Sequence, residues 1–101
     1  MGSRLDLHTL LESILGSTNV YFQPPESISL KYPCIIYNRD YIKTEYANNS
    51  PYTLGKRYSV TVIDKNPDSV IPDNIAAMPK CTFERHFTAD NLNHDIFNLY
   101  F

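Results

Sequence analysis

The spacing of apolar positions near the start of the chain predicts an amphipathic helix. Five aliphatic residues recur three and four positions apart, which places them on one stripe of a helix surface: Leu7, Leu10, Leu11, Ile14 and Leu15. Gly16 follows this stripe, and glycine readily adopts the left-handed conformation that ends a helix. We therefore expect the helix to end there.

Three strands are expected after this helix. Residues 19–23 are short, β-branched and aromatic, and Pro24-Pro25 ends them because proline lacks the donor that a ladder requires. Residues 34–37 are apolar on both faces and predict a central strand. Residues 57–64 alternate with period two, which is typical of a strand with one better buried face.

A polar, tyrosine-rich segment between the second and third strands predicts a hairpin arm at about residues 39–56. Asn48-Asn49-Ser50-Pro51 is the strongest turn sequence in the chain. Its flanks, residues 41–44 and 52–54, favour strands but carry too little apolar surface to lie in a core. We expect this arm to project.

The second half of the chain predicts a short helix. Asn66-Pro67-Asp68-Ser69 is a turn with helix-capping residues. Three apolar residues then recur at helical spacing: Ile71, Ile75 and Met78. Pro72 fits the first helical turn, whereas Pro79 prevents the helix from continuing.

Two strands are expected to close the chain. Apolar and polar side chains alternate in both, with the apolar sets being Cys81, Phe83 and Phe87, and then Phe97, Leu99 and Phe101. The polar turn Thr88-Ala89-Asp90-Asn91 joins them into an antiparallel hairpin. The order helix, three strands, helix, two strands predicts a single α+β domain over residues 1–101. We expect two layers, with both helices on one face of a mostly antiparallel sheet.

Composition narrows the possible functions. The 101 residues are 43% hydrophobic, which is too apolar for a disordered chain. The formal charge of -2 and the scattered basic residues argue against a protein that grips nucleic acid through its phosphates. Lys56 and Arg57, the one adjacent basic pair, are interpreted as a solvated strand start. No apolar run approaches the roughly 20 residues of a membrane-spanning helix.

The residues that often carry chemistry form no recognised motif. His8, His86 and His94 lack metal-binding spacing, and the three glycines form no phosphate-binding loop. We therefore expect no metal, no cofactor and no enzymatic activity. One alternative remains, in which His94 with Asp95 and nearby Asp90 forms a general base with an orienting carboxylate.

Acidic and thiol side chains also have simple interpretations. Asp64, Asp68 and Asp73 straddle a strand end, a turn and a helix start, where carboxylates cap free backbone amides more often than they bind calcium. Cys34 and Cys81 lie in apolar, β-rich settings, and we expect both to be reduced thiols.

Tyrosine is the unusual feature of the chain. Eight Tyr and five Phe exceed what a core of this size needs, and four tyrosines lie around the expected arm: Tyr41, Tyr46, Tyr52 and Tyr58. Tyrosine is typical of association surfaces, although cross-strand pairing within the hairpin would also explain it. The two interpretations are compatible. The candidate subunit contacts are Lys43, Glu45, Tyr46, Tyr52 and Lys56.

Several strings resemble those of a known family, the tail-completion or tail-terminator proteins of long-tailed, siphovirus-type bacteriophages. The resemblance covers most of the chain and rests on Tyr32-Pro33-Cys34-Ile35-Ile36-Tyr37, on residues 52–64, on Asn66-Pro67-Asp68-Ser69 with Ile71-Pro72, and on residues 88–94. These strings are distinctive together and weak individually.

This resemblance implies a minor structural protein of the virion, assembled in the host bacterial cytoplasm. Copies would form a homohexameric ring on the last ring of the tail-tube protein, stop tube growth and offer a docking face for head-tail joining through the connector protein. DNA would pass through the ring without specific binding. Another neck component, such as a head-closure or connector protein, is the nearest alternative, and a small enzyme using His94 and Asp90 is a second.

Overall fold

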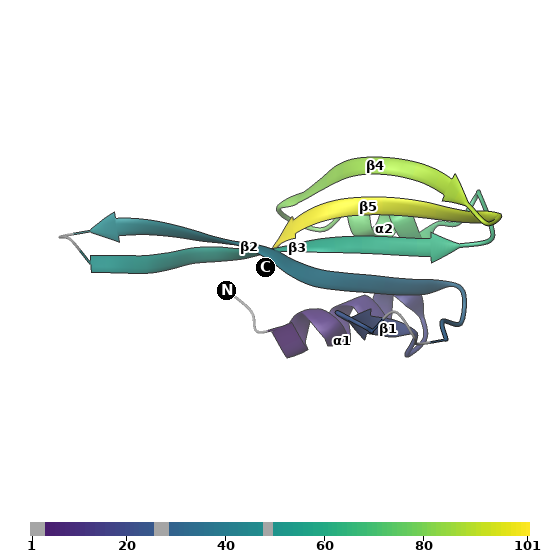
Figure 1. Cartoon of the computed structure of the whole chain (residues 1–101), viewed down its shortest axis with the longest axis horizontal. Helices are drawn as coiled ribbons and strands as arrows, with labels where there is room; N and C mark the ends of the chain where they lie inside the picture. The colour runs from purple at the N-terminus through teal and green to yellow at the C-terminus, as the bar shows by residue number, and fades with distance from the viewer. Residues whose placement is uncertain (1–3, 26–28, 48–49) are drawn as a thin grey trace.

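A computed structural model describes residues 4–25, 29–47 and 50–101, with the backbone alone for 42–47 and 50–55. Two helices and five strands follow one another in the predicted order (Figure 1): α1 (Arg4–Leu15), β1 (Val20–Phe22), β2 (Cys34–Ala47), β3 (Ser50–Asp64), α2 (Ile71–Ala76), β4 (Cys81–Ala89) and β5 (Leu92–Tyr100). The predicted α+β class is confirmed.

The strands form one mixed sheet in the order β1-β2-β3-β5-β4. β1 runs parallel to β2, and the other three pairs are antiparallel. The parallel pair was not foreseen, because parallel neighbours are usually joined by a crossover helix and residues 23–33 contain no helical pattern. Beside this pairing, backbone bonds flank β1 at each end, from the Ile35 amide to the Asn19 carbonyl and from the Gln23 amide to the Tyr37 carbonyl.

Helix α1 ends as predicted. Gly16 has φ of 81°, and its amide donates a hydrogen bond to the Glu12 carbonyl at 2.8 Å. The buried side of the helix is narrower than the predicted stripe and consists of Leu7, Leu11 and Leu15. Leu10 is 39% exposed because it lies at the margin of this stripe, where neither the sheet nor α2 covers it fully.

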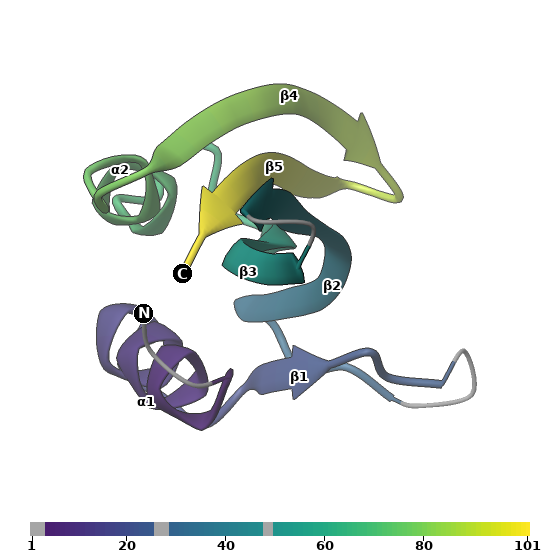
Figure 2. The same ribbon diagram turned by 90° about the vertical axis from the view of Figure 1, so that its left-hand side faces the viewer.

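The core lies between the helices and one face of the sheet. Figure 2 shows α1 and α2 on the same side of the sheet, while the other side carries no helix. The sheet contributes the largest share of the buried side chains, which include Val20, Ile35, Tyr37, Tyr58, Val60, Val62, Phe97 and Leu99. The period-two pattern of residues 57–64 therefore identified the buried face correctly, through Tyr58, Val60 and Val62.

Tyr37 joins this core to α1. Its ring is fully buried, and its hydroxyl lies 2.7 Å from Nδ1 of His8 and accepts a hydrogen bond from Arg4 at 3.3 Å. Burial raises the pKa of Tyr37, so the neutral phenol is the form that the fold favours.

Helix α2 begins and ends close to the expected residues. Val70 directly precedes the helix and makes no side-chain capping bond, but Ser69, one of the predicted capping residues, accepts a hydrogen bond from the Ile71 amide through its hydroxyl. The Asp64 carboxylate accepts one from the Asn66 amide at 2.9 Å, so it closes the preceding turn and not the helix. Pro72 lies in the first helical turn, as predicted.

Strand β4 departs from simple alternation. Its register against β5 shifts between Phe83 and Arg85, so Phe83 faces Phe97 whereas Phe87 faces His94. Since neighbouring residues of β5 point to opposite sides, Phe83 and Phe87 lie on opposite faces of the sheet and not on one face as expected. The predicted antiparallel hairpin is confirmed, with left-handed Asp90 and Asn91 forming its two-residue turn.

Candidate interaction surface

The most distinctive surface feature is the long ribbon formed by β2 and β3. Strand β5 stops pairing with β3 at Arg57 opposite Tyr100, and the Phe101 amide bonds to the Lys56 carbonyl. Beyond that point β2 and β3 pair only with each other, as far as Ala47 opposite Ser50. Figure 1 shows this ribbon extending well past the other strands, and the molecule measures 52 × 27 × 23 Å. We refer to residues 42–56 as the arm.

The predicted contact residues all lie on this arm. Glu45 stands opposite Tyr52, and Tyr46 opposite Pro51, while Lys43 is paired with Gly55. The side chains of these residues fall outside the described part of the structure, as does the predicted turn at residues 48–49. Lys56 is described; it is half-buried at the root of the arm, opposite Ile42.

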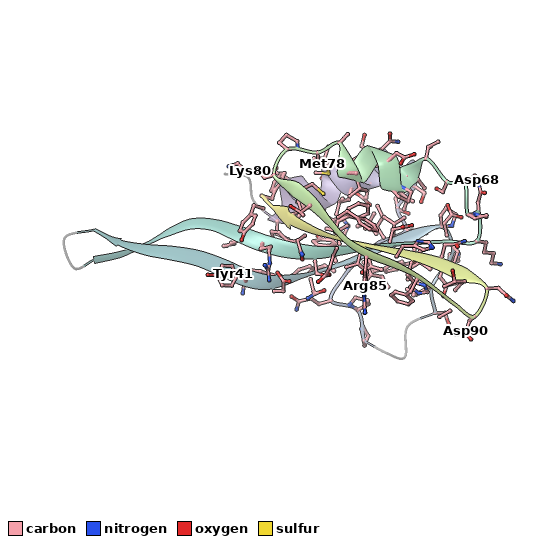
Figure 3. All side chains as sticks on the ribbon, turned by 90° about the horizontal axis from the view of Figure 1, so that it is seen from above. Tyr41, Asp68, Met78, Lys80, Arg85 and Asp90 are labelled. Carbon is pink, nitrogen blue, oxygen red and sulfur yellow. The ribbon has the colours of Figure 1, made fainter. Side chains whose placement is uncertain are left out.

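The root of the arm is held by a contact between Arg57 and Asp40. Asp40 occupies a bulge in β2, between Arg39 and Tyr41. The Arg57 guanidinium donates to both carboxylate oxygens of Asp40, at 3.0 and 3.4 Å. Its carbon also lies 5.2 Å from the centre of the exposed Tyr41 ring, which Figure 3 labels at the root of the arm. This two-point contact ties β3 to the bulge of β2 at the point where the ribbon leaves the body.

The expected strand start at Lys56-Arg57 is wrong, because β3 begins at Ser50 and runs through both residues. The hydrogen bond to Asp40 raises the pKa of Arg57. Tyr58 belongs to the body, as the strand prediction for residues 57–64 implied: it is 3% exposed, and its ring centre lies 6.0 Å from that of Tyr37. Arg57 and Asp40 lie 17 residues apart, so no local pattern linked them.

The second distinctive feature is the free edge of the sheet at β4. Every residue from Thr82 to Ala89 is exposed, and Phe83 and Phe87 remain 52% and 37% exposed. Phe83 packs edge-on against Phe97, while Phe87 stacks on His94 with Arg85 above its ring. Figure 3 shows Arg85 on the side of the sheet away from the helices. Sequence alternation alone could not assign these aromatic side chains to a face of the sheet. The bulge at Glu84 turns the residues after it, including Phe87, to the opposite face.

The structure does not bring His94 and Asp95 together. Adjacent residues of a strand point to opposite faces, so His94 and Asp95 cannot meet. His94 instead stacks on Phe87, with Nδ1 3.1 Å from the Leu92 carbonyl oxygen. The carboxylate of Asp95 contacts the cross-strand His86, at 2.7 Å from its Nδ1. A residue-by-residue register of β4 and β5 would have revealed this pair.

Neither cysteine lies in a setting that activates a thiol. Cys34 is buried, and burial together with the nearby Asp64 raises its pKa to about 11. Burial also raises the pKa of the half-buried Cys81. Both are free thiols. A high pKa leaves little of the reactive thiolate at neutral pH.

The remaining surface offers a shallow open groove on the side of the sheet without helices. Its walls come from the β1–β2 connection and from β2, and include Pro24, Pro25, Leu30, Ile36 and Arg39. No cluster of three or more metal-ligating side chains occurs among those that the structure describes. No helix in the described ranges has the length and apolar character needed to cross a membrane.

No protein-family model and no curated protein matches this chain.

Proposed function

We propose that this chain is a structural subunit of a bacteriophage tail, the tail terminator. Copies form a homohexameric ring on the end of the tail tube, stop its growth and provide the surface that joins the head connector. The subunit acts in the virion by fitting against its neighbours, and no bond is made or broken. The observation that carries this proposal is the arm.

An arm of this kind favours a role in assembly. A two-stranded hairpin is only marginally stable in water without further strands or a packed face. At about 3.3 Å per residue, the six residues of β2 from 42 to 47 extend roughly 20 Å beyond the sheet. The clamp between Arg57 and Asp40 orients this ribbon at its root. A ribbon that is directed outward and lacks its own support gains stability by contact with another molecule.

The strings that carry the family resemblance also lie together. Residues 32–37 and 52–64 include paired stretches of β2 and β3, where Cys34 stands opposite Ile63 and Tyr37 opposite Val60. These same strands continue into the arm. The resemblance therefore covers much of the buried β2–β3 pair from which the arm extends, together with the start of α2 and the β4–β5 turn.

Charge is compatible with a passage for DNA. A ring through which a genome slides should not hold phosphates, because each neutralised phosphate adds salt-sensitive affinity. The chain has a formal charge of -2. The positive charge of Arg57 is paired with the carboxylate of Asp40. A mildly acidic subunit satisfies this requirement.

Electron microscopy of the purified protein mixed with isolated tail tubes tests the proposal. We expect tubes capped at one end, and we expect phages that lack the gene to make overlong tails. Filled heads that leak DNA, with tails of normal length, would indicate a head-closure or connector protein instead. Normal particles would contradict both roles.

A His94→Phe variant separates assembly from the alternative of a small enzyme. It removes the imidazole but keeps an aromatic ring that can stack on Phe87, so we expect this variant to cap tubes as the native protein does. Loss of capping with an intact fold, measured by circular dichroism, would show that His94 takes part in the function.

A further inference from the structure

Strand β4 ends the sheet with an unusually accessible edge. It pairs with β5 on one side, and no other described strand lies on its outer side. The opposite edge of the sheet is different, because β1 has only three residues and Val20 is buried near α1. A strand with unpaired backbone donors and acceptors is a template for another strand. β4 is therefore the edge that needs an explanation.

The bulge in β4 determines which part of this edge can accept a strand. Pairing with β5 is disturbed between Phe83 and Arg85, and it is regular from Arg85 to Ala89. A bulge interrupts the ladder locally and bends the strand, so a long partner cannot pair across it. The regular five-residue stretch, residues 85–89, is the acceptor that remains.

The arm has the complementary properties. Its two strands pair with each other alone, so each has a free outer edge. The β3 side contains Pro51, whose missing amide proton weakens it as a pairing edge, and Gly55. The β2 side, residues 42–47, contains neither proline nor glycine, and those of its residues that do not bond to β3 offer free backbone donors and acceptors. The register of the arm shifts between Lys43 and Thr44, but the extra residue, Leu54, belongs to β3, so residues 42–47 stay consecutive. This stretch is long enough for an acceptor of five residues.

Geometry prevents these two surfaces from meeting within one subunit. Figure 1 shows the arm leading away from the body, whereas β4 lies along the body on the far side of β5. A contact between them must therefore join two copies. The two surfaces are different, so the contact is heterologous, and repeated contacts of this type close into a ring when the rotation allows it.

We propose that the β2 edge of the arm, residues 42–47, adds as a further strand to residues 85–89 of β4 in a neighbouring copy. This inference rests on the proposed ring, and it names the surface that receives the arm. The added strand would satisfy the outer backbone groups of β4 and cover part of the exposed Phe87 ring.

Hydrogen exchange tests the backbone bonds directly. The amides of residues 42–47 and 85–89 are compared in the free protein and in protein assembled on tail tubes. We expect the outward-facing amides of both stretches to exchange at least about tenfold more slowly after assembly. Unchanged exchange at residues 85–89 in capped tubes would overturn the inference while leaving the terminator role intact. Failure to cap tubes at all would overturn both.

Cross-linking between two separately prepared variants tests which surfaces meet. One carries Thr44→Cys and the other Thr88→Cys, both with Cys81→Ser to remove the more accessible native thiol. A short bismaleimide should join them only after mixing on tail tubes. A control that replaces Thr88→Cys with Ser13→Cys, on the exposed side of α1, should give no cross-linked pair. Equal cross-linking in both mixtures would contradict the proposed contact.

Discussion

At the residue scale, the environment of Cys34 shows how burial and a nearby carboxylate lower the reactivity of a thiol. Its thiol lies in β2 with no exposed surface, opposite Ile63 of β3. The uncharged thiol is favoured there because desolvation penalises the thiolate and Asp64 repels it. Sequence context predicted a buried cysteine but could not supply Asp64, which lies 30 positions away and is brought near by the β2–β3 pairing.

The first prediction concerns alkylation of this thiol. With a pKa of about 11, only about one Cys34 thiol in a thousand is ionised at pH 8. We expect iodoacetamide to modify the half-buried Cys81 first, and Cys34 only after the protein is unfolded. Mass spectrometry of digested protein, with and without denaturant, measures both sites. Rapid modification of native Cys34 would contradict the burial described here.

The second prediction concerns stability in alkaline solution. The Cys34 pKa is about 11 in the folded chain against an ordinary value of 9.0, so folding favours the protonated thiol. Its contribution is fully present below pH 9 and is lost as the pH rises from 9 towards 11. Urea unfolding of the native protein should show this fall in the free energy of unfolding. A Cys34→Ala variant should show a smaller decrease over the same pH interval.

At the element scale, the helices and most strands follow from local pattern, whereas their partners do not. Gly16 predicted the end of α1, and the alternation of residues 57–64 predicted the buried face of β3. Both depend only on residues that are close together in the sequence. The parallel pairing of β1, the bulge in β4 and the contact of Arg57 with Asp40 were missed, because each depends on register between strands. The sequence predicted the arm as a segment, but the contact between Arg57 and Asp40 at its root could be seen only in the structure.

The third prediction concerns this clamp. Replacing Arg57→Lys keeps the positive charge but removes the fork that reaches both oxygens of Asp40. We expect arm amides in residues 42–47 to exchange several-fold faster, while Val60 in the core is unchanged. Asp40→Asn should have a similar effect, since it weakens the same contact. Unaltered exchange in both variants would show that the clamp does not orient the arm.

At the scale of the whole molecule, the shape divides into a body and an arm with different sources of stability. The body has one layer of helices over one face of the sheet, with its core between them. The arm draws on its two-stranded pairing and on its root. Substitutions in the arm should therefore separate assembly from folding more cleanly than substitutions in the body.

The fourth prediction uses this separation. A variant with Tyr46→Ser and Tyr52→Ser should unfold at nearly the native temperature but require at least about tenfold more protein to cap tail tubes, because aromatic side chains often dominate interfaces. Lys65→Ser, in the exposed β3–α2 connection, serves as a control and should cap normally. Equal capping by the tyrosine variant would remove these two residues from the contact surface.

The irregularity in β4 has a further consequence for contacts between two β4 edges. Flat, uninterrupted edge strands let identical molecules adhere to one another and precipitate. The break beside Glu84 shortens the regular stretch, and the charge of Arg85 makes direct pairing of two such edges less favourable. The bulge therefore protects this exposed edge from joining the same edge of another molecule.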